Sequence, residues 1–204
     1  MNAMGDLRCG LVALLCVVSS AGLSWSQPTP PAQKPVWRMS VVTDYFWPEG
    51  DLRNWADASD LVVVGSVADS RVEVTPSGSH LPPRVTTIYE IAVAEFIKGA
   101  GTERKVLLRV SGGRVDIGDK ILDVVNASMP RLEKGERYVL LLKRSDSAAA
   151  RTAADAPIYG PLAGAEAVFV ISPDQRIKVP GQGRLARSFE GKSAAALLNE
   201  LRGR

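Results

Sequence analysis

Few residues of this chain have the side chains that carry most enzyme chemistry. Its two cysteines, Cys9 and Cys16, fall inside an apolar N-terminal run, and its one histidine, His80, lies in a segment rich in Ser, Gly and Pro. No serine stands in a G-x-S-x-G or S-x-x-K pattern, so the common serine hydrolase signatures are absent. One histidine and no thiol after export leave little for metal ligation or general acid–base catalysis. We therefore expect no catalytic residue, no cofactor and no metal site.

Acidic side chains are the next candidates, and they form two groups. Asp116, Asp119 and Asp123 are close in sequence, but their spacing does not match the ligand alternation of a calcium loop, so we expect a solvated loop. The second group lies on two strands that are expected to pair, and it consists of Glu73, Glu90 and Glu95. These acids could converge into a hydrolytic site. We favour the alternative that they lie on the solvated face of a sheet.

Aromatic and basic side chains are the best candidates for binding. The candidate binding residues are Tyr45, Phe46, Trp47, Trp55, Arg114 and Arg131. The four aromatic residues are expected to close an open end of the fold as part of its core. If some of them are exposed beside one of the two arginines, they form a stacking or protein-docking surface, because aromatic and arginine side chains concentrate binding energy.

The net charge of the chain does not point to a particular class of binding partner. The formal net charge is +3, and Lys and Arg are scattered among Asp and Glu. A nucleic-acid binder usually gathers its cations into a stripe or patch, so the sequence carries no strong nucleic-acid signal. Binding of a single-stranded nucleic acid or another polyanion would require cations aligned along one face of the fold.

The N-terminal 26 residues are typical of a secretory signal peptide. An apolar run over 9–23 follows Arg8 and is shorter than the roughly 20 residues that cross a bilayer. Cleavage is expected after Ser26, with an earlier cut after Ala21 and an uncleaved anchor as the alternatives. The sequence thus predicts a secreted or periplasmic protein with no membrane span once the signal is removed.

The rest of the chain is expected to form one domain behind a linker. Residues 27–35 contain four prolines in the run QPTPPAQKP and predict an extended linker, and residues 36–204 predict the domain. Alternating or continuous apolar runs predict strands at 36–42, 61–74, 84–97, 105–110, 115–125, 137–143, 167–171 and 176–179. Gly65 predicts a bulge within its strand. Asp51 and Ser193 are each expected to cap a short helix, one near each end of the domain.

This order of elements predicts a mainly β fold, because strands follow one another with glycine bends and no helical crossovers. The specific expectation is a small antiparallel barrel of the OB-like type, with short flanking helices at both ends.

Four segments carry a resemblance to known families, and they are ADLVVVGSV, IYEIAVAEFIKG, KVLLRV and MPRLEKGERYVLLLKR. Over about residues 58–180 they resemble a group of uncharacterised exported bacterial proteins. More remotely, they are similar to the netrin-like OB-fold module of the tissue inhibitors of metalloproteinases. Those inhibitors chelate zinc with an N-terminal disulfide-bonded cysteine, which no position here matches, so inhibition does not carry over.

The resemblance implies a secreted barrel that binds through its loops or one open face, with a protein or an extended polymer as the partner. The predicted function is therefore a non-catalytic binding or interaction module. The alternative is an exported hydrolase with a carboxylate site on its sheet.

Overall fold

The fold is mainly β, as the sequence predicts, and its strands form two sheets. The computed structural model describes residues 33–78, 82–99, 104–145 and 157–203. The strands are β1 (Val36–Val41), β2 (Leu61–Thr75), β3 (Arg84–Lys98), β4 (Lys105–Ser111), β5 (Gly113–Asp116), β6 (Ile121–Asn126), β7 (Arg137–Arg144), β8 (Ile158–Pro161), β9 (Val168–Ile171) and β10 (Ile177–Lys178). The helices are α1 (Leu52–Ala58), the 3-10 helix η2 (Gly164–Ala167), α2 (Arg184–Arg187) and α3 (Ala194–Leu201).

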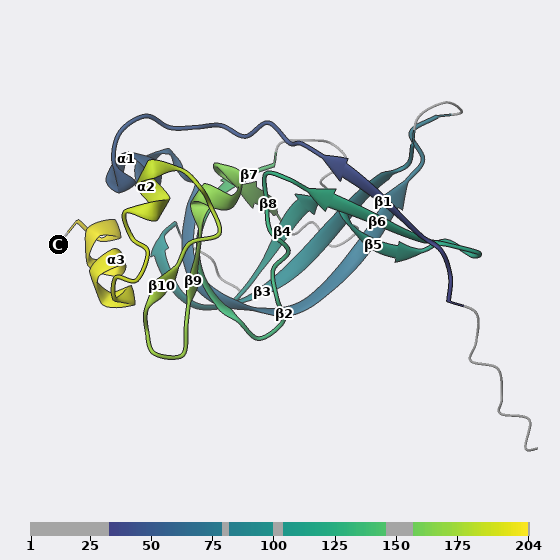
Figure 1. Cartoon of the computed structure of the whole chain (residues 1–204). Helices are drawn as coiled ribbons and strands as arrows, with labels where there is room; N and C mark the ends of the chain where they lie inside the picture. The colour runs from purple at the N-terminus through teal and green to yellow at the C-terminus, as the bar shows by residue number, and fades with distance from the viewer. Residues whose placement is uncertain (1–32, 79–81, 100–103, 146–156, 204) are drawn as a thin grey trace, which may run out of the picture. The chain divides into compact units, whose positions relative to one another are not determined.

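The larger sheet curls into a partly closed ring of strands. Its order is β10-β9-β7-β2-β3-β4-β8, and β8 also pairs with β7. The pairings therefore run from β7 through β2, β3, β4 and β8 and return to β7 (Figure 1). Closure is weak at β8, a strand of four residues that shares two paired positions with β4.

The longest pair in this ring is the antiparallel hairpin of β2 and β3. Along β3 every second residue is buried, as the alternation in the sequence predicts; these residues are Val85, Thr87, Tyr89, Ile91 and Val93. The pairing of β2 with β3 is irregular between Val64 and Gly65. A Cβ on Gly65 would lie 2.6 Å from the carbonyl oxygen of Ala92, so a side chain there would push β3 away. The bulge predicted at Gly65 is confirmed.

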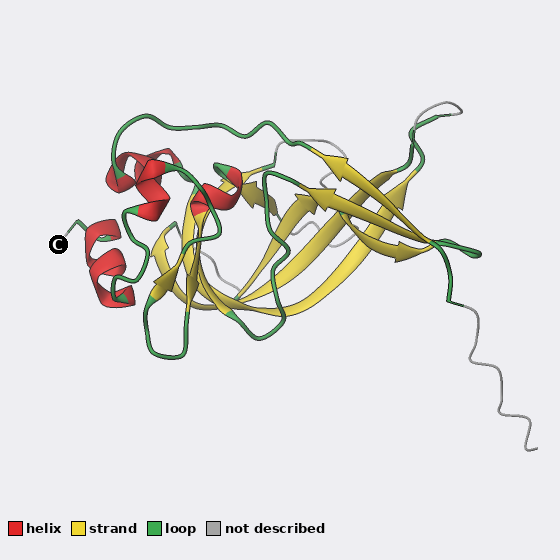
Figure 2. Cartoon of the chain, viewed as in Figure 1, coloured by secondary structure: helices red, strands yellow, loops and turns green. Residues whose placement is uncertain are grey.

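Both faces are buried over residues 61–65 of β2 and over residues 138–142 of β7, which explains the almost continuous apolar runs there. Inside the ring, Leu61 and Val63 pack with Leu140 and other apolar side chains. On the outer face, Val62 and Leu141 pack in a second cluster that includes residues of α1, η2, α2 and α3. The helices therefore cover one face of the large sheet, and Figure 2 shows them gathered at one end of the described fold.

The two predicted helix caps are confirmed. The side chain of Asp51 accepts a hydrogen bond from the backbone N–H of Asn54 at 3.0 Å, at the start of α1. The side chain of Ser193 accepts one from Ala196 N–H at 3.2 Å, at the start of α3. Each bond satisfies a backbone donor that the first helical turn leaves without a partner.

The smaller sheet has the order β1-β6-β5, and it differs from the predicted arrangement. The single irregular strand predicted over 115–125 is instead two strands, β5 and β6, because a turn at Gly118, with φ +79°, separates them. β1 pairs with β6 in parallel, as β8 does with β4, so the expectation of a wholly antiparallel sheet is wrong. β8 itself is absent from the predicted strands.

The described residues from Lys34 onward form one compact unit. The predicted signal peptide, most of the predicted linker and His80 lie outside the described residues. Within the part of the chain that the structure describes, no helix combines the length and the apolar character needed to cross a bilayer.

Candidate functional site

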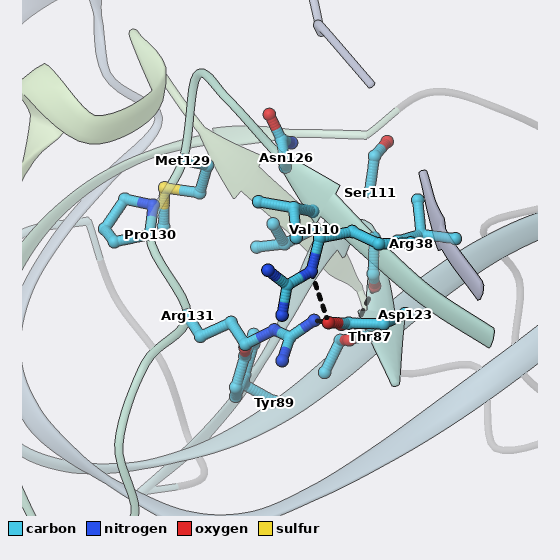
Figure 3. Close-up of a pocket in the computed structure, with 14 residues that line it drawn as sticks. Arg38, Thr87, Tyr89, Val110, Ser111, Asp123, Asn126, Met129, Pro130 and Arg131 are labelled. Carbon is cyan, nitrogen blue, oxygen red and sulfur yellow. Dashed lines mark hydrogen bonds and ion pairs between the residues drawn. The ribbon is translucent and has the colours of Figure 1, made fainter. Parts of the chain in front are cut away.

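A cavity of about 360 Å³ lies where the small sheet meets the ring, and we call it the mouth cavity. Its wall combines side chains of β1, β3, β4 and β6 with the segment Met129–Arg131, which follows β6 (Figure 3). Small-molecule sites typically have volumes of about 300–1,000 Å³, so the cavity has room for a small ligand.

The charged centre of the mouth cavity is Asp123, which two arginines approach from different elements. Its Oδ2 accepts a hydrogen bond from Arg38 Nε at 3.2 Å, and its Oδ1 accepts one from Arg131 Nη2. Figure 3 shows both guanidinium groups converging on this carboxylate. Asp123 is 3% exposed, whereas the side chains of Arg38 and Arg131 are 74% and 45% exposed. The acid is thus buried beneath two accessible cations.

The electrostatics of this cluster keep Asp123 ionised. The hydrogen bond from Arg131 lowers the pKa of the Asp123 carboxyl below its usual value, and Arg38 acts in the same direction against the opposing effect of burial. Because one carboxylate faces two guanidinium groups, the cluster keeps an excess of positive charge.

Strand register brings Arg38 to Asp123. In the parallel pair of β1 and β6, Arg38 lies directly across from Asp123, although the two residues are 85 positions apart. On the other side of β6, Arg114 of β5 lies across from the same residue and is exposed. The expectation that Asp123 belongs to a solvated loop is wrong, because it occupies the centre of a three-stranded sheet.

Two buried tyrosines hold the segment that carries Arg131. Tyr89 Oη accepts the backbone N–H of Leu132 at 3.3 Å, and Tyr138 Oη accepts that of Glu133 at 2.8 Å. Burial raises the pKa of both tyrosine hydroxyls, so they stay neutral at ordinary pH. The chain on the C-terminal side of Arg131 is therefore fixed against the interior of the ring.

A glycine pair at the junction of β4 and β5 lets the chain pass close to β6 and to Thr87 of β3. Gly112 has φ +99°, and a Cβ there would lie 2.8 Å from the carbonyl oxygen of Val124. Its own carbonyl accepts a hydrogen bond from Thr87 Oγ1 at 2.7 Å. Gly113 has φ +151°, and a Cβ on it would lie 2.7 Å from the same hydroxyl oxygen. The floor of the cavity therefore depends on two positions without side chains.

Asn126 forms the polar wall away from the arginines. Its Nδ2 donates to Thr43 Oγ1 at 3.2 Å and to Tyr45 Oη at 3.3 Å, and its Oδ1 accepts the backbone N–H of Ser128 at 2.9 Å. Burial raises the pKa of the Tyr45 hydroxyl. Of the predicted aromatic residues, Tyr45 thus contacts the cavity wall.

The other predicted aromatic residues separate in the structure. Trp55 is buried in the cluster beneath the helices, as expected for core. Phe46 and Trp47 are 63% and 56% exposed, so the expectation that they belong to the core is wrong for these two. Trp47 instead packs edge-on against Trp55, with 6.3 Å between ring centroids. Phe46 and Trp47 lie in the loop before α1, whereas Trp55 lies on the buried face of that helix, which explains the difference.

The three sheet glutamates are not brought together. Glu73 pairs with Arg71, at 3.1 Å from Nε to Oε1. The partner of Glu90 is Lys105, at 2.7 Å from Nζ to Oε1, and Glu95 pairs with Arg202. Each acid thus lies beside a different cation.

Among the described residues, no group of three His, Cys, Asp or Glu side chains could hold a metal ion.

Arg131 and Arg114 are recognisable in the sequence as binding candidates. Their connection to Asp123, Arg38 and Asn126 is visible only in the fold. One signal is present: Asp123 interrupts an apolar run between Leu122 and Val124, where a lone acid indicates a buried partner.

Comparison with protein-family models and comparison with curated proteins found no match for this chain.

Proposed function

We propose that this chain is an exported, non-catalytic binding module whose ligand occupies the mouth cavity. The observation that carries the proposal is the buried Asp123 holding two accessible arginines at the wall of a cavity of about 360 Å³. Binding sites commonly combine an apolar lining with a few convergent polar groups. The partly closed ring supports the further proposal of an OB-like barrel, a fold that binds ligands through one face and its loops.

The chemistry of the cavity favours binding over catalysis. Both oxygens of Asp123 accept hydrogen bonds from arginine, and the pKa of its carboxyl is lowered, so it is a poor general base near neutral pH. The alternative of an exported hydrolase with a carboxylate site draws no support from the sheet glutamates, since each lies in a separate ion pair.

A thermal-shift screen of small metabolites tests the proposal. The screen is run on the unchanged chain and on a variant whose larger side chain fills the cavity. Val125 lines the cavity and is 38% exposed, so Val125→Trp should fold and fill part of the space. Val74, on β2, has nearly the same exposure, 39%, and Val74→Trp is the matched control.

Compounds that stabilise the unchanged chain and the control but not Val125→Trp would support a ligand site in the cavity. Stabilisation that survives Val125→Trp would place binding elsewhere and overturn the proposal. Turnover of a substrate in a parallel hydrolase panel would overturn its non-catalytic part.

A further inference from the structure

We infer that the ligand of the mouth cavity is a small organic oxyanion, a molecule that joins a carboxylate or phosphate group to an apolar body. Arg38 and Arg131 bind its anionic group. This inference rests on the proposed function and names the class of ligand that the cavity takes.

The first support comes from the donors that the two arginines retain. Within the described residues, Arg38 and Arg131 each donate one N–H to Asp123. A guanidinium group carries five N–H donors in a planar fork that matches carboxylate and phosphate oxygens. Most donors of both forks are therefore left for a ligand, and the partial exposure of both side chains makes them accessible.

The second support is the charge of the cluster. Asp123 neutralises one of the two guanidinium groups, and an anion would neutralise the other. The carboxylate also fixes both cations before a ligand arrives, which lowers the conformational entropy lost on binding. Arg114 adds a further exposed cation across from Asp123 on β5. A neutral or cationic ligand would leave this excess charge uncompensated.

The third support is the apolar part of the wall. Val110 and Met129 are 5% and 3% exposed and line the cavity with the ring of Tyr89. These side chains favour an apolar body on the ligand, which a phenyl ring can represent in a probe. Because the cationic side chains of the described cavity lining are Arg38 and Arg131, the site fits one oxyanion rather than the successive phosphates of a nucleic acid.

Four probes separate the charge of the ligand from its apolar body. Phenylacetate and phenyl phosphate carry both features, phenylacetamide is the neutral analogue, and inorganic phosphate lacks the apolar body. Isothermal titration of the purified chain should show phenylacetate or phenyl phosphate binding about tenfold or more tightly than phenylacetamide, because the amide lacks the charge-assisted bonds. Inorganic phosphate should bind more weakly than phenyl phosphate. The preferred anionic probe then distinguishes a carboxylate site from a phosphate site.

Substitution of each arginine assigns the binding to the cavity. Arg38→Gln and Arg131→Gln should each weaken the preferred anionic probe by about tenfold. Arg38 is largely exposed, so Arg38→Gln should fold, and melting curves of both variants check this. Arg71→Gln removes the same charge from an exposed ion pair on β2, which does not line the cavity, and should leave the affinity unchanged.

Two results of these titrations would overturn the inference. The first is equal affinity for phenylacetate, phenyl phosphate and phenylacetamide, or no binding of any anionic probe at millimolar concentration. The second is anion binding that the Arg38→Gln and Arg131→Gln variants retain in full. If the metabolite screen identifies a neutral ligand that Val125→Trp excludes, the proposed binding module stands and the oxyanion inference fails.

Discussion

The two ends of this fold are held together by different physics. Under the helices, the outer face of the large sheet packs against α1, η2, α2 and α3 through apolar side chains such as Leu141 and Phe169, which are fully buried. At the small sheet, the described apolar cluster has three buried members, Val85, Leu122 and Val124. Beside them lie the buried carboxylate of Asp123 and the partly exposed Arg38 and Arg131. Polar side chains thus take the place that apolar side chains have at the other end.

This contrast separates the part of the molecule that supplies stability from the part that is available for binding. A closely packed apolar cluster excludes water and leaves no group for a ligand. The small sheet is expected to contribute less to the stability of the fold, because polar groups and a cavity replace apolar contacts there. Variants within each end and within the ring can test this contrast.

The largest expected effect is the truncation of a buried leucine under the helices, compared with a buried leucine of the small sheet. Leu141→Ala should destabilise the fold by about 4 kcal/mol and Leu122→Ala by about 2 kcal/mol, because the cost depends on how far the surroundings can relax into the space. Leu141 lies between a sheet and its covering helices, whereas the neighbours of Leu122 include the partly buried Met39 and Val115. Urea unfolding at neutral pH measures both free energies of unfolding.

Equal losses for the two leucine variants would contradict the contrast between the ends. An unchanged dependence of the free energy on urea concentration is the control, because it shows that native and unfolded states keep their compactness.

A smaller effect is expected from an added methyl group in the strand pairs of the ring. Gly65→Ala should cost about 2 kcal/mol, because its Cβ would lie 2.6 Å from the Ala92 carbonyl oxygen and 2.8 Å from an Ile91 methyl carbon. Gly160, on β8, has no heavy atom within 4 Å of a built Cβ, so Gly160→Ala is the matched control and should cost almost nothing. Melting temperatures of both variants measure the difference. A loss at Gly160 as large as that at Gly65 would show that β8 is packed as closely as β2.

Local patterns in the sequence predict the packed end well. The alternation along β3, the continuous apolar run of β2 and the caps at Asp51 and Ser193 each depend on residues a few positions apart, so they can be recognised without the fold. These features place the long hairpin of the large sheet and two of its covering helices.

The site at the other end depends on pairings that no local pattern shows. Arg38 meets Asp123 because β1 pairs in parallel with β6, and a periodic pattern reports that a strand is buried but not which strand is its neighbour. Arg131 is recognisable as a binding candidate by its residue type alone. Its role becomes visible only when Tyr89 and Tyr138 are seen to fix the following backbone.

The smallest expected effect is electrostatic and depends on pH. Asp123→Asn should destabilise the fold by about 1 kcal/mol at pH 7, since the arginine partners are partly exposed and solvent screens the interaction. The bond from Arg131 lowers the folded-state pKa of Asp123 below its unfolded value. Its contribution is therefore complete above the unfolded pKa of about 3.9 and is lost as the pH falls through the folded pKa.

Free energies of unfolding of the unchanged chain and Asp123→Asn, measured from pH 7 to pH 3, should therefore converge toward the acid end. Asp119→Asn removes an exposed carboxylate from the neighbouring turn without removing a bond to either arginine, so it should match the unchanged chain throughout. A gap for Asp123→Asn that stays constant down to pH 3 would mean that the asparagine disturbs packing rather than charge. The small sheet would then be stabilised by side-chain packing, as the helix-covered end is. The two ends would no longer differ in an electrostatic contribution to stability.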